Sequence, residues 1–216
     1  MKAETRFGAR LASQAGVTLA ELLVVLAIIA VVAGMSIPSL SRTIENAQLK
    51  GATQSLATVY QQARILATQD NTSYEVLIAP AGPSAAQACI DLDGDGICDA
   101  GDPVTVFSQK VIVSNLGVPL KMGSSTLGFQ PQDTEHSQMF DQQNQLAPGL
   151  AWNGRGIPCE RTLSSTAPCL AIGWVQYLQF QRSGGDMAYA AVSVSPTGRV
   201  RTWTFIPSGN GNGKWL

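Results

Sequence analysis

The most constraining feature of the sequence is an apolar run that begins beside Gly16 and continues to Met35. From Val17 to Ile37 the run has twenty-one residues. A helix of that length, at about 1.5 Å per residue, crosses a hydrocarbon layer about 30 Å thick. Glu21 is the one charged residue within it. A carboxylate in apolar surroundings costs several kcal/mol unless an opposite charge pairs with it, so Glu21 requires a partner.

Three interpretations of this run compete. The leader before it carries the charged residues Lys2, Glu4, Arg6 and Arg10. Its basic excess predicts that it stays in the cytoplasm while the rest of the chain lies across the membrane. A plain anchor explains the length but leaves Glu21 unpaired. A cleaved secretory signal peptide also fits, although a sixteen-residue leader and an acid at the start of the apolar region are unusual for one.

The third interpretation rests on the segment Gly16–Ala30, GVTLAELLVVLAIIA, which resembles the prepilin leader of the type IV pilin-like superfamily. That leader has glycine before the cut, a hydrophobic residue after it and glutamate at the fifth mature position. The resemblance implies that prepilin peptidase cleaves between Gly16 and Val17 and that Val17 becomes N-methylated, although most relatives have phenylalanine there. It also implies that Glu21 pairs with the α-amino group of a neighbouring subunit, which neutralises both charges and sets the register of assembly.

The composition favours an exported protein that is not an enzyme. Charged residues make up 13% of the chain, against about 25% in ordinary soluble proteins. The net charge of −1 provides no overall basic field that would attract nucleic acid. The sequence has no phosphate-binding loop and no recognisable Ser/His/Asp set, and its single histidine, His136, lies in a polar region.

The predicted fold class is α+β and pilin-like, with one long N-terminal helix packed on an antiparallel sheet. Between Ser39 and Gln69 apolar residues recur every three or four positions, which is typical of one helix face. We therefore expect one helix from Val17 to Gln69, kinked near Gly34 or Pro38. The expected segments are a cleaved leader at 1–16, a transmembrane or filament-core helix at 17–38, an amphipathic helical half at 39–70 and a β-rich head at 71–216.

The head is expected to consist of strands. The segments rich in β-formers are Ser73–Ala79, Val104–Val113, Thr126–Phe129, Leu150–Trp152, Gly173–Gln181, Met187–Ser195 and Gly198–Ile206. Turn residues at 183–186 and 196–198 separate the last three, which predicts an antiparallel meander. We interpret 80–88 and 130–148 as polar loops, and the Gly-Asn repeat at 209–213 as a flexible tail.

The helix-then-strands layout and the phrase SPTGRVR at 195–201 resemble the GspH/FimT branch of the superfamily. This resemblance implies a minor pilin that is held in the inner membrane with its N-terminus cytoplasmic and its head periplasmic. It would then enter a type IV pilus at or near the tip and help to prime assembly. The implied partners are prepilin peptidase and other minor and major pilins or pseudopilins. A GspH-like pseudopilin of a type II secretion system and a protein-binding adhesive tip module remain alternatives.

Cysteine usage indicates an oxidising compartment. The four cysteines are Cys89, Cys98, Cys159 and Cys169. None forms a C-x-x-C pair, so a zinc site or a thioredoxin-type redox motif is disfavoured. Four cysteines allow three pairings. We favour Cys89–Cys98 with Cys159–Cys169, because each disulfide would close one compact loop.

An acidic loop at 91–102 has the spacing of a calcium-binding loop. The candidate ligands are the carboxylates of Asp91, Asp93, Asp95, Asp99 and Asp102 and the backbone carbonyl of Ile97. The loop departs from an EF-hand because it ends in aspartate and lacks clear flanking helices. It resembles the Asp-rich calcium loops of thrombospondin-type repeats and dockerins. The sequence predicts a structural Ca²⁺, and a solvated Asp-Gly turn held by a disulfide is the alternative.

The last predicted strand carries a basic phrase. Arg199 and Arg201 alternate with Val200, so they point to one face, followed by Trp203, and Lys214 lies further on. Two arginines beside an aromatic ring can hold phosphates and stack a base. In FimT-type relatives a Gly-Arg-x-Arg phrase near the C-terminus is associated with DNA capture in natural transformation. The resemblance thus implies weak, salt-sensitive DNA binding, and a solvent-facing pair beside a core tryptophan is the alternative.

Overall fold

The computed structural model describes residues 16–80, 86–108, 110–114, 117–129, 131–133, 149–160, 171–208 and 213–216. The chain forms two compact units, residues 1–41 and residues 42–216. Helix α1 (Leu19–Asp70) begins in the first unit and ends in the second. The predicted helix from Val17 to Gln69 is therefore confirmed, and the helical assignment continues through Gly34.

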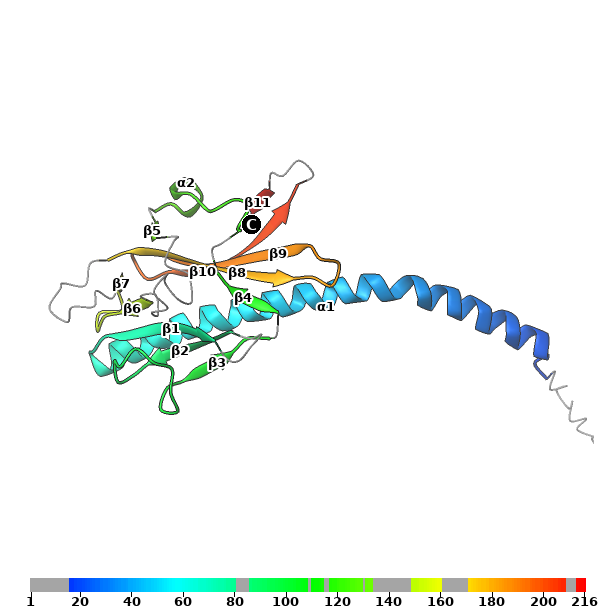
Figure 1. Ribbon diagram of the computed structural model, residues 1–216, viewed down its shortest axis with the longest axis horizontal. Helices are drawn as coiled ribbons and strands as arrows, with labels where there is room; N and C mark the ends of the chain where they lie inside the picture. Colours follow the sequence, from blue (N-terminus) through cyan, green and yellow to red (C-terminus); the bar gives the residue numbers. More distant parts are fainter. Residues whose placement is uncertain are drawn as a thin grey trace, which may run out of the picture. The chain divides into compact units, whose positions relative to one another are not determined.

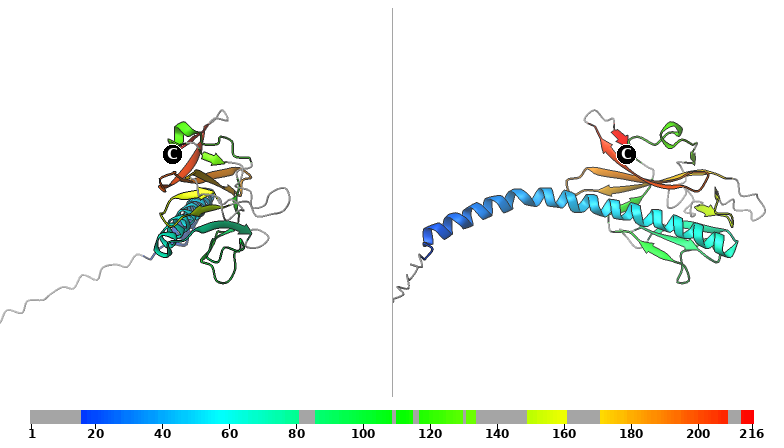
Figure 2. Two further views of the ribbon diagram at one scale, coloured as in Figure 1. Left: turned by 90° about the vertical axis from the view of Figure 1, so that its left-hand side faces the viewer. Right: turned by 180° about the vertical axis from the view of Figure 1, so that it is seen from behind.

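Within residues 42–216, α1 buries one face. The buried apolar residues on this face are Leu49, Ala52, Leu56, Ala57, Val59, Tyr60, Ala63 and Ala67. Their spacing of mostly three and four residues places them along one side of a helix. Figures 1 and 2 show this half of α1 lying against two sheets, and the same apolar cluster takes in residues from both.

Two sheets contain the strands of the head. The first has the order β3-β2-β1-β6-β7 and is antiparallel throughout. Its strands are β1 (Tyr74–Pro80), β2 (Ala86–Asp91), β3 (Val104–Val106), β6 (Leu150–Trp152) and β7 (Pro158–Glu160). The second has the order β11-β10-β9-β8-β4 and is antiparallel, with β5 added parallel to β8. Its strands are β4 (Val111–Val113), β5 (Pro131–Asp133), β8 (Gly173–Gln181), β9 (Met187–Val194), β10 (Val200–Pro207) and β11 (Gly213–Trp215).

Strand β8 is buried on both faces, because each face covers a separate apolar cluster. Trp174 and Leu178 belong to the main core with α1 and the first sheet. Val175 and Tyr177 belong to a second cluster, with Trp215 of β11 and residues around the short helix α2 (Ser124–Leu127). Both clusters lie entirely within residues 42–216, so this unit has its own core and the basis for folding alone.

The α+β fold class and the C-terminal meander are confirmed. Gly173–Gln181 coincides with β8, and β9 and β10 differ from the predicted segments by one or two residues. The prediction of a single strand at Val104–Val113 is wrong. β3 and β4 belong to different sheets, because Lys110 adopts a positive φ of 76° and Val111 N–H bonds the carbonyl of Ser108.

Three further assignments are corrected. Thr126–Phe129 is not a strand, because α2 ends there at Gly128, whose φ of 72° closes a helical turn onto the Ser124 carbonyl. The predicted loop at 80–88 contains the end of β1 and the start of β2, and 131–133 forms β5, while 134–148 lies outside the described residues. Of the tail predicted at 209–213, Gly213 pairs with Pro207 at the start of β11, and 209–212 lies outside the described residues.

Candidate functional site

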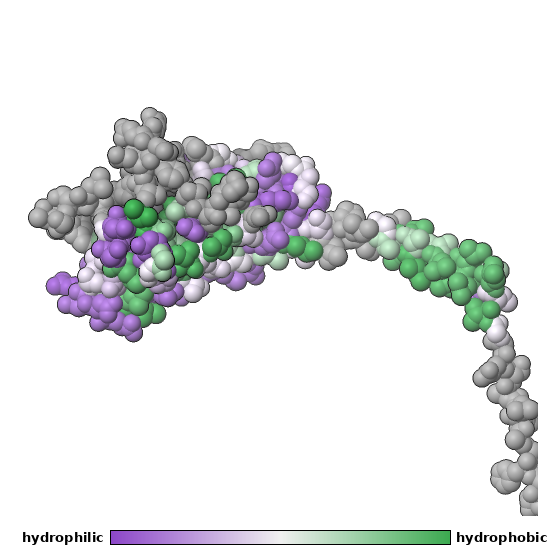
Figure 3. Space-filling model, turned by 60° about the horizontal axis from the view of Figure 1, so that its bottom comes forward, coloured by the Kyte–Doolittle hydropathy of each residue, from purple (hydrophilic) through white to green (hydrophobic). Residues whose placement is uncertain are grey.

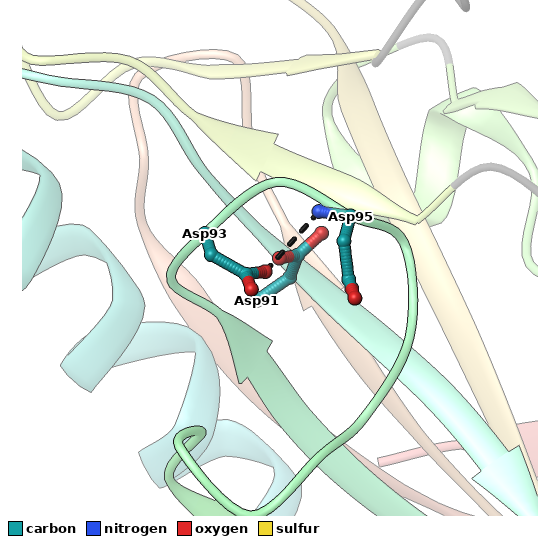
Figure 4. A group of neighbouring side chains, drawn as sticks. All are labelled: Asp91, Asp93 and Asp95. Carbon is teal, nitrogen blue, oxygen red and sulfur yellow. Dashed lines mark hydrogen bonds between the residues drawn. The ribbon is translucent and has the colours of Figure 1, made fainter.

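The acidic loop connects β2 to β3. Carboxylate oxygens of Asp91, Asp93 and Asp95 lie within 4.8 Å of one another, and Figure 4 shows the Asp91 and Asp93 groups close together. Asp91 is buried, whereas the other two are exposed. Asp91 accepts hydrogen bonds from the backbone N–H groups of Gly94, at 2.6 Å, and Gly96, at 3.0 Å. These bonds curl the loop around the buried carboxylate.

The remaining predicted ligands have other roles. Asp102 accepts hydrogen bonds from the N–H groups of Leu92, at 3.0 Å, and Asp99, at 3.3 Å, so it braces the base of the loop. Ile97 donates its N–H to Asp95 at 2.7 Å. Among the described residues the structure gathers Asp91, Asp93 and Asp95 into the metal-type group, and Asp99 and Asp102 are not part of it.

Disulfide bonds secure this region. The predicted Cys89–Cys98 bond is present, with Cα atoms 5.8 Å apart, and it ties the end of β2 to the loop. Cys159 in β7 is also disulfide-bonded. Cys169 lies outside the described residues, so its pairing with Cys159 stays a prediction.

A groove of about 400 Å³ lies beside the basic strand. Its lining comprises Leu127, Gly128, Phe129, Ser193, Ser195, Pro196, Thr197, Arg199 and Arg201. Both arginines are exposed, and they line the same groove as their alternation predicts. Three hydroxyl groups join them, and no acidic residue is among the lining residues. The groove can therefore supply cationic and neutral donors to one anion.

The other two residues of the predicted basic site lie elsewhere. Trp203 is half-buried, packs on the second cluster and donates its indole N–H to the Ser193 hydroxyl at 2.8 Å. Its ring thus forms part of the groove's support. Lys214 pairs with Ile206 across β10 and β11, which places it on the opposite face of the strand from Arg201. Lys214 does not line the groove.

The start of α1 is organised by a cap. The Thr18 hydroxyl accepts a hydrogen bond from the backbone N–H of Glu21 at 3.2 Å. This is the N-cap bond of a Thr-x-x-Glu capping box, a spacing that the sequence contains but that our sequence analysis did not use. Glu21 is exposed in the first helical turn, where the positive end of the helix favours an acid.

The apolar part of α1 is not covered by any described residue of the chain. Every residue from Val17 to Gly34 is exposed, including Leu23 at 59% and Ile28 at 58%. Figure 3 shows this stretch as a continuous hydrophobic surface. A helix that is apolar on all sides is stable in water only when another apolar body surrounds it.

A transmembrane span was predicted at residues 17–38. Within the described part of the chain, however, no helix is both long enough and apolar enough to cross a membrane.

Residues 11–37 match the prokaryotic N-terminal methylation motif. Comparison with curated proteins and with solved structures gives no match. The motif indicates a type IV pilin-like or pseudopilin protein, and it implies processing by prepilin peptidase and assembly with other pilins. Proteins of this kind are structural and not enzymatic, in agreement with the composition. The match ends before the head, so the GspH/FimT assignment rests on the sequence resemblance alone.

The geometry around the motif suits proteolytic processing. Gly16 and Val17 are exposed and lie before the first residue of α1, so the peptide bond between them is not protected by helical hydrogen bonds. A Cβ atom added to Gly16 would meet nothing within 4 Å. Packing against the described residues therefore does not require a glycine at this position.

Proposed function

We propose that the protein is a minor pilin of the GspH/FimT type. It is anchored in the inner membrane until it is assembled into a type IV pilus at or near the tip, where it helps to prime assembly. The start of α1 carries the pilin part of the proposal: an exposed Gly16–Val17 bond, a capped first turn and an exposed apolar surface that holds a single acid. The GspH/FimT part rests on the resemblance of the phrase SPTGRVR.

Assembly in this proposal depends on the charge of Glu21. Cleavage after Gly16 exposes a new amino group at Val17, which the peptidase system methylates. As apolar helices bundle, the Glu21 carboxylate meets the amine of a neighbouring subunit. Each charge alone is costly in apolar surroundings, and the pair offsets that cost only at one stagger.

The test separates the charge of Glu21 from its place in the capping box. Glu21→Gln keeps a side chain suited to the box but removes the charge, whereas Thr18→Ala removes the cap and keeps the charge. We expect Glu21→Gln to be processed but missing from sheared filaments, and Thr18→Ala to be incorporated. Intact-mass analysis and immunoblots of sheared fractions measure both. Wild-type incorporation of Glu21→Gln would reject the proposed assembly mechanism.

Two alternatives concern the machine in which the protein acts. A GspH-like pseudopilin would use the same leader in a type II secretion system, and an adhesive module would use the head to bind a protein. The disulfides, the acidic loop and the Arg phrase favour the pilus. A deletion strain distinguishes the cases: loss of pili supports the minor pilin, and loss of protein secretion with normal pili supports the pseudopilin.

We further propose that the groove lined by Arg199 and Arg201 binds DNA through its phosphates. Two guanidinium groups line the same groove as Ser193, Ser195 and Thr197, and none of its described lining residues is acidic. Such contacts to phosphate position a nucleic acid without reading its sequence. The patch is small, so binding is expected to be weak and steeply dependent on salt.

Fluorescence anisotropy with a short labelled duplex tests this contact in the unit 42–216. Arg199→Ala and Arg201→Ala should each weaken binding and reduce the slope of log affinity against log salt by about one. Lys214→Ala is the matched control, because it removes one positive charge from the opposite face of the strand. Unchanged affinity in the double arginine variant would reject the groove as the contact.

We also propose that Asp91, Asp93 and Asp95 hold a structural Ca²⁺. Oxygens that share one Ca²⁺ at about 2.3–2.6 Å lie no more than about 5 Å apart, which agrees with the 4.8 Å spread of this group. Calorimetry with Ca²⁺ should show binding by the unit 42–216, and Asp93→Asn should abolish it, whereas Asp70→Asn on α1 should not. No detectable heat at millimolar Ca²⁺ would reject the site.

A further inference from the structure

The turn between β9 and β10 carries the proposed DNA contact. Ser195 N–H bonds the Arg199 carbonyl at 2.9 Å, and Gly198 N–H bonds the Ser195 carbonyl at 2.7 Å. The Ser195 hydroxyl accepts a further bond from Arg199 N–H at 3.0 Å. Gly198 has a φ of 81°, a conformation that favours glycine. These bonds define the turn's shape but do not attach it to the rest of the head.

Arg64 of α1 makes that attachment. Its Nη1 donates a hydrogen bond to the Gly198 carbonyl at 2.9 Å, across 134 residues of sequence. Its guanidinium carbon lies 5.6 Å from the centre of the Trp152 ring, in a cation–π contact. Trp152 is fully buried in the main core. The buried indole therefore restricts the position of the Arg64 guanidinium group. The hydrogen bond from that group to Gly198 in turn restricts the position of the turn.

The packing around this contact is tight. A Cβ atom on Gly198 would lie 3.0 Å from Arg64 Cζ, 3.1 Å from Trp152 Cζ3 and 2.9 Å from the Gly156 carbonyl oxygen. A Cβ on Gly156 would in turn lie 3.0 Å from Arg64 Nε. Both glycines are thus needed for the guanidinium to reach the turn, and Arg64 has little freedom once it is there.

We propose that Arg64 is a positioning residue for the groove, and this rests on the proposed DNA-binding function. Arg64 is not among the residues that line the groove. It acts through the Gly198 carbonyl on the next residue, Arg199, whose side chain does line it. Arg64, which lies toward the C-terminal end of α1, thereby positions the arginine side of the groove. The assembly motif lies at the N-terminal end of the same helix.

Hydrogen exchange tests the positioning without DNA. In the unit 42–216, Arg64→Met should speed exchange of the Gly198 and Arg199 amides about tenfold or more, because their turn loses its tie to α1. Amides in the centre of β8 should exchange as in wild type. Arg64→Lys, which keeps a cation and one donor, should restore part of the protection. Lys50→Met is the matched control, since it removes one exposed charge from the same helix. Unchanged exchange at Gly198 and Arg199 would overturn the proposal.

DNA binding gives the second readout. Arg64→Met should weaken binding at least about threefold, because a charge-assisted bond that orders the turn is lost. The salt slope should stay at the wild-type value, since Arg64 contacts no phosphate, whereas Arg199→Ala lowers it by about one. A lowered slope in Arg64→Met, or faster exchange throughout β8, would overturn the positioning role. If the wild-type unit binds no DNA, the DNA proposal fails, and the exchange experiment still decides whether Arg64 holds the turn.

Discussion

Helix α1 contains two kinds of apolar surface. From Val17 to Gly34 the apolar side chains are exposed, as at Leu22 with 55% exposure, whereas within residues 42–216 one face of α1 is buried, as at Leu56 with 0%. Both apolar clusters lie in the second unit, and none of the described side chains of the first unit belongs to either. The difference agrees with the proposed function, in which other subunits cover the first unit, whereas the strands of the second unit cover its own core.

The largest expected effect is the loss of leader cleavage in the first unit, with the fold of the second unit unchanged. Gly16→Leu should abolish cleavage, so that intact-mass analysis finds the leader still attached. A side chain at Gly16 meets nothing within 4 Å, and therefore the loss would reflect recognition by the peptidase and not misfolding. Thermal unfolding of the head should match wild type. Normal maturation of Gly16→Leu would contradict the assignment of the cut.

The next prediction concerns the stability of the second unit and leaves leader cleavage unchanged. Leu56→Ala should lower the free energy of unfolding of the unit 42–216 by about 2–5 kcal/mol, because it leaves a cavity where α1 meets the main core. Urea denaturation measures the change. Ile65→Ala is the matched control, since Ile65 lies on α1 within the same unit and is 55% exposed. A loss below about 0.5 kcal/mol at Leu56 would contradict the core assignment.

A third prediction concerns the loop of the head. Replacing Cys89 and Cys98 together by serine should lower the free energy of unfolding by about 2–3 kcal/mol, since the bond closes a short loop. Any Ca²⁺ binding should weaken as well, because the loop loses its tie to β2. Urea denaturation and calorimetry give the two readouts. Equal stability of the serine variant and the oxidised protein would show that the loop is ordered by other contacts.

The sequence predicted what depends on local pattern. The length of α1 and the alternation that puts Arg199 and Arg201 on one face both follow from neighbouring residues. The hydroxyl of Ser193 does not, because it reaches the groove only through the pairing of Ser193 with Arg201 across β9 and β10. The face of Lys214 likewise depends on strand register, which no local pattern specifies.

Contacts between residues far apart in the sequence also explain why one strand was predicted wrongly. The run Val104–Val113 is rich in β-formers, but the described residues place its two ends in different sheets, with a positive φ at Lys110 between them. The link from Arg64 to Gly198 joins residues 134 apart and requires the whole main core to be in place. The motif at the start of α1 could therefore be predicted from the sequence. Which residues share a surface of the head could be identified only from the tertiary structure.

The smallest expected effect concerns Glu45, which lies on α1 a few residues after the start of the second unit. Glu45 of α1 accepts hydrogen bonds from the N–H, at 2.9 Å, and the hydroxyl, at 2.5 Å, of Ser183 in the β8–β9 turn. These bonds hold the pKa of Glu45 below its usual value of 4.5. A carboxylate whose pKa is lowered by folding stabilises the fold above its unfolded pKa, and this contribution is lost as the pH falls through the folded pKa.

Wild-type stability of the unit 42–216 should therefore decline more steeply below about pH 4.5 than that of Glu45→Gln, which cannot titrate. Urea denaturation between neutral and acidic pH measures the two slopes. Asp186→Asn is the control within the same turn: Arg182 also lowers the pKa of Asp186, but Asp186 itself makes none of the hydrogen bonds that Glu45 accepts. Its variant should keep the acid sensitivity that comes from Glu45. Parallel slopes for wild type and Glu45→Gln would mean that the turn is held to α1 by the hydrogen bond from Arg182 to Asn46, which does not titrate in this pH range, and not by the carboxylate.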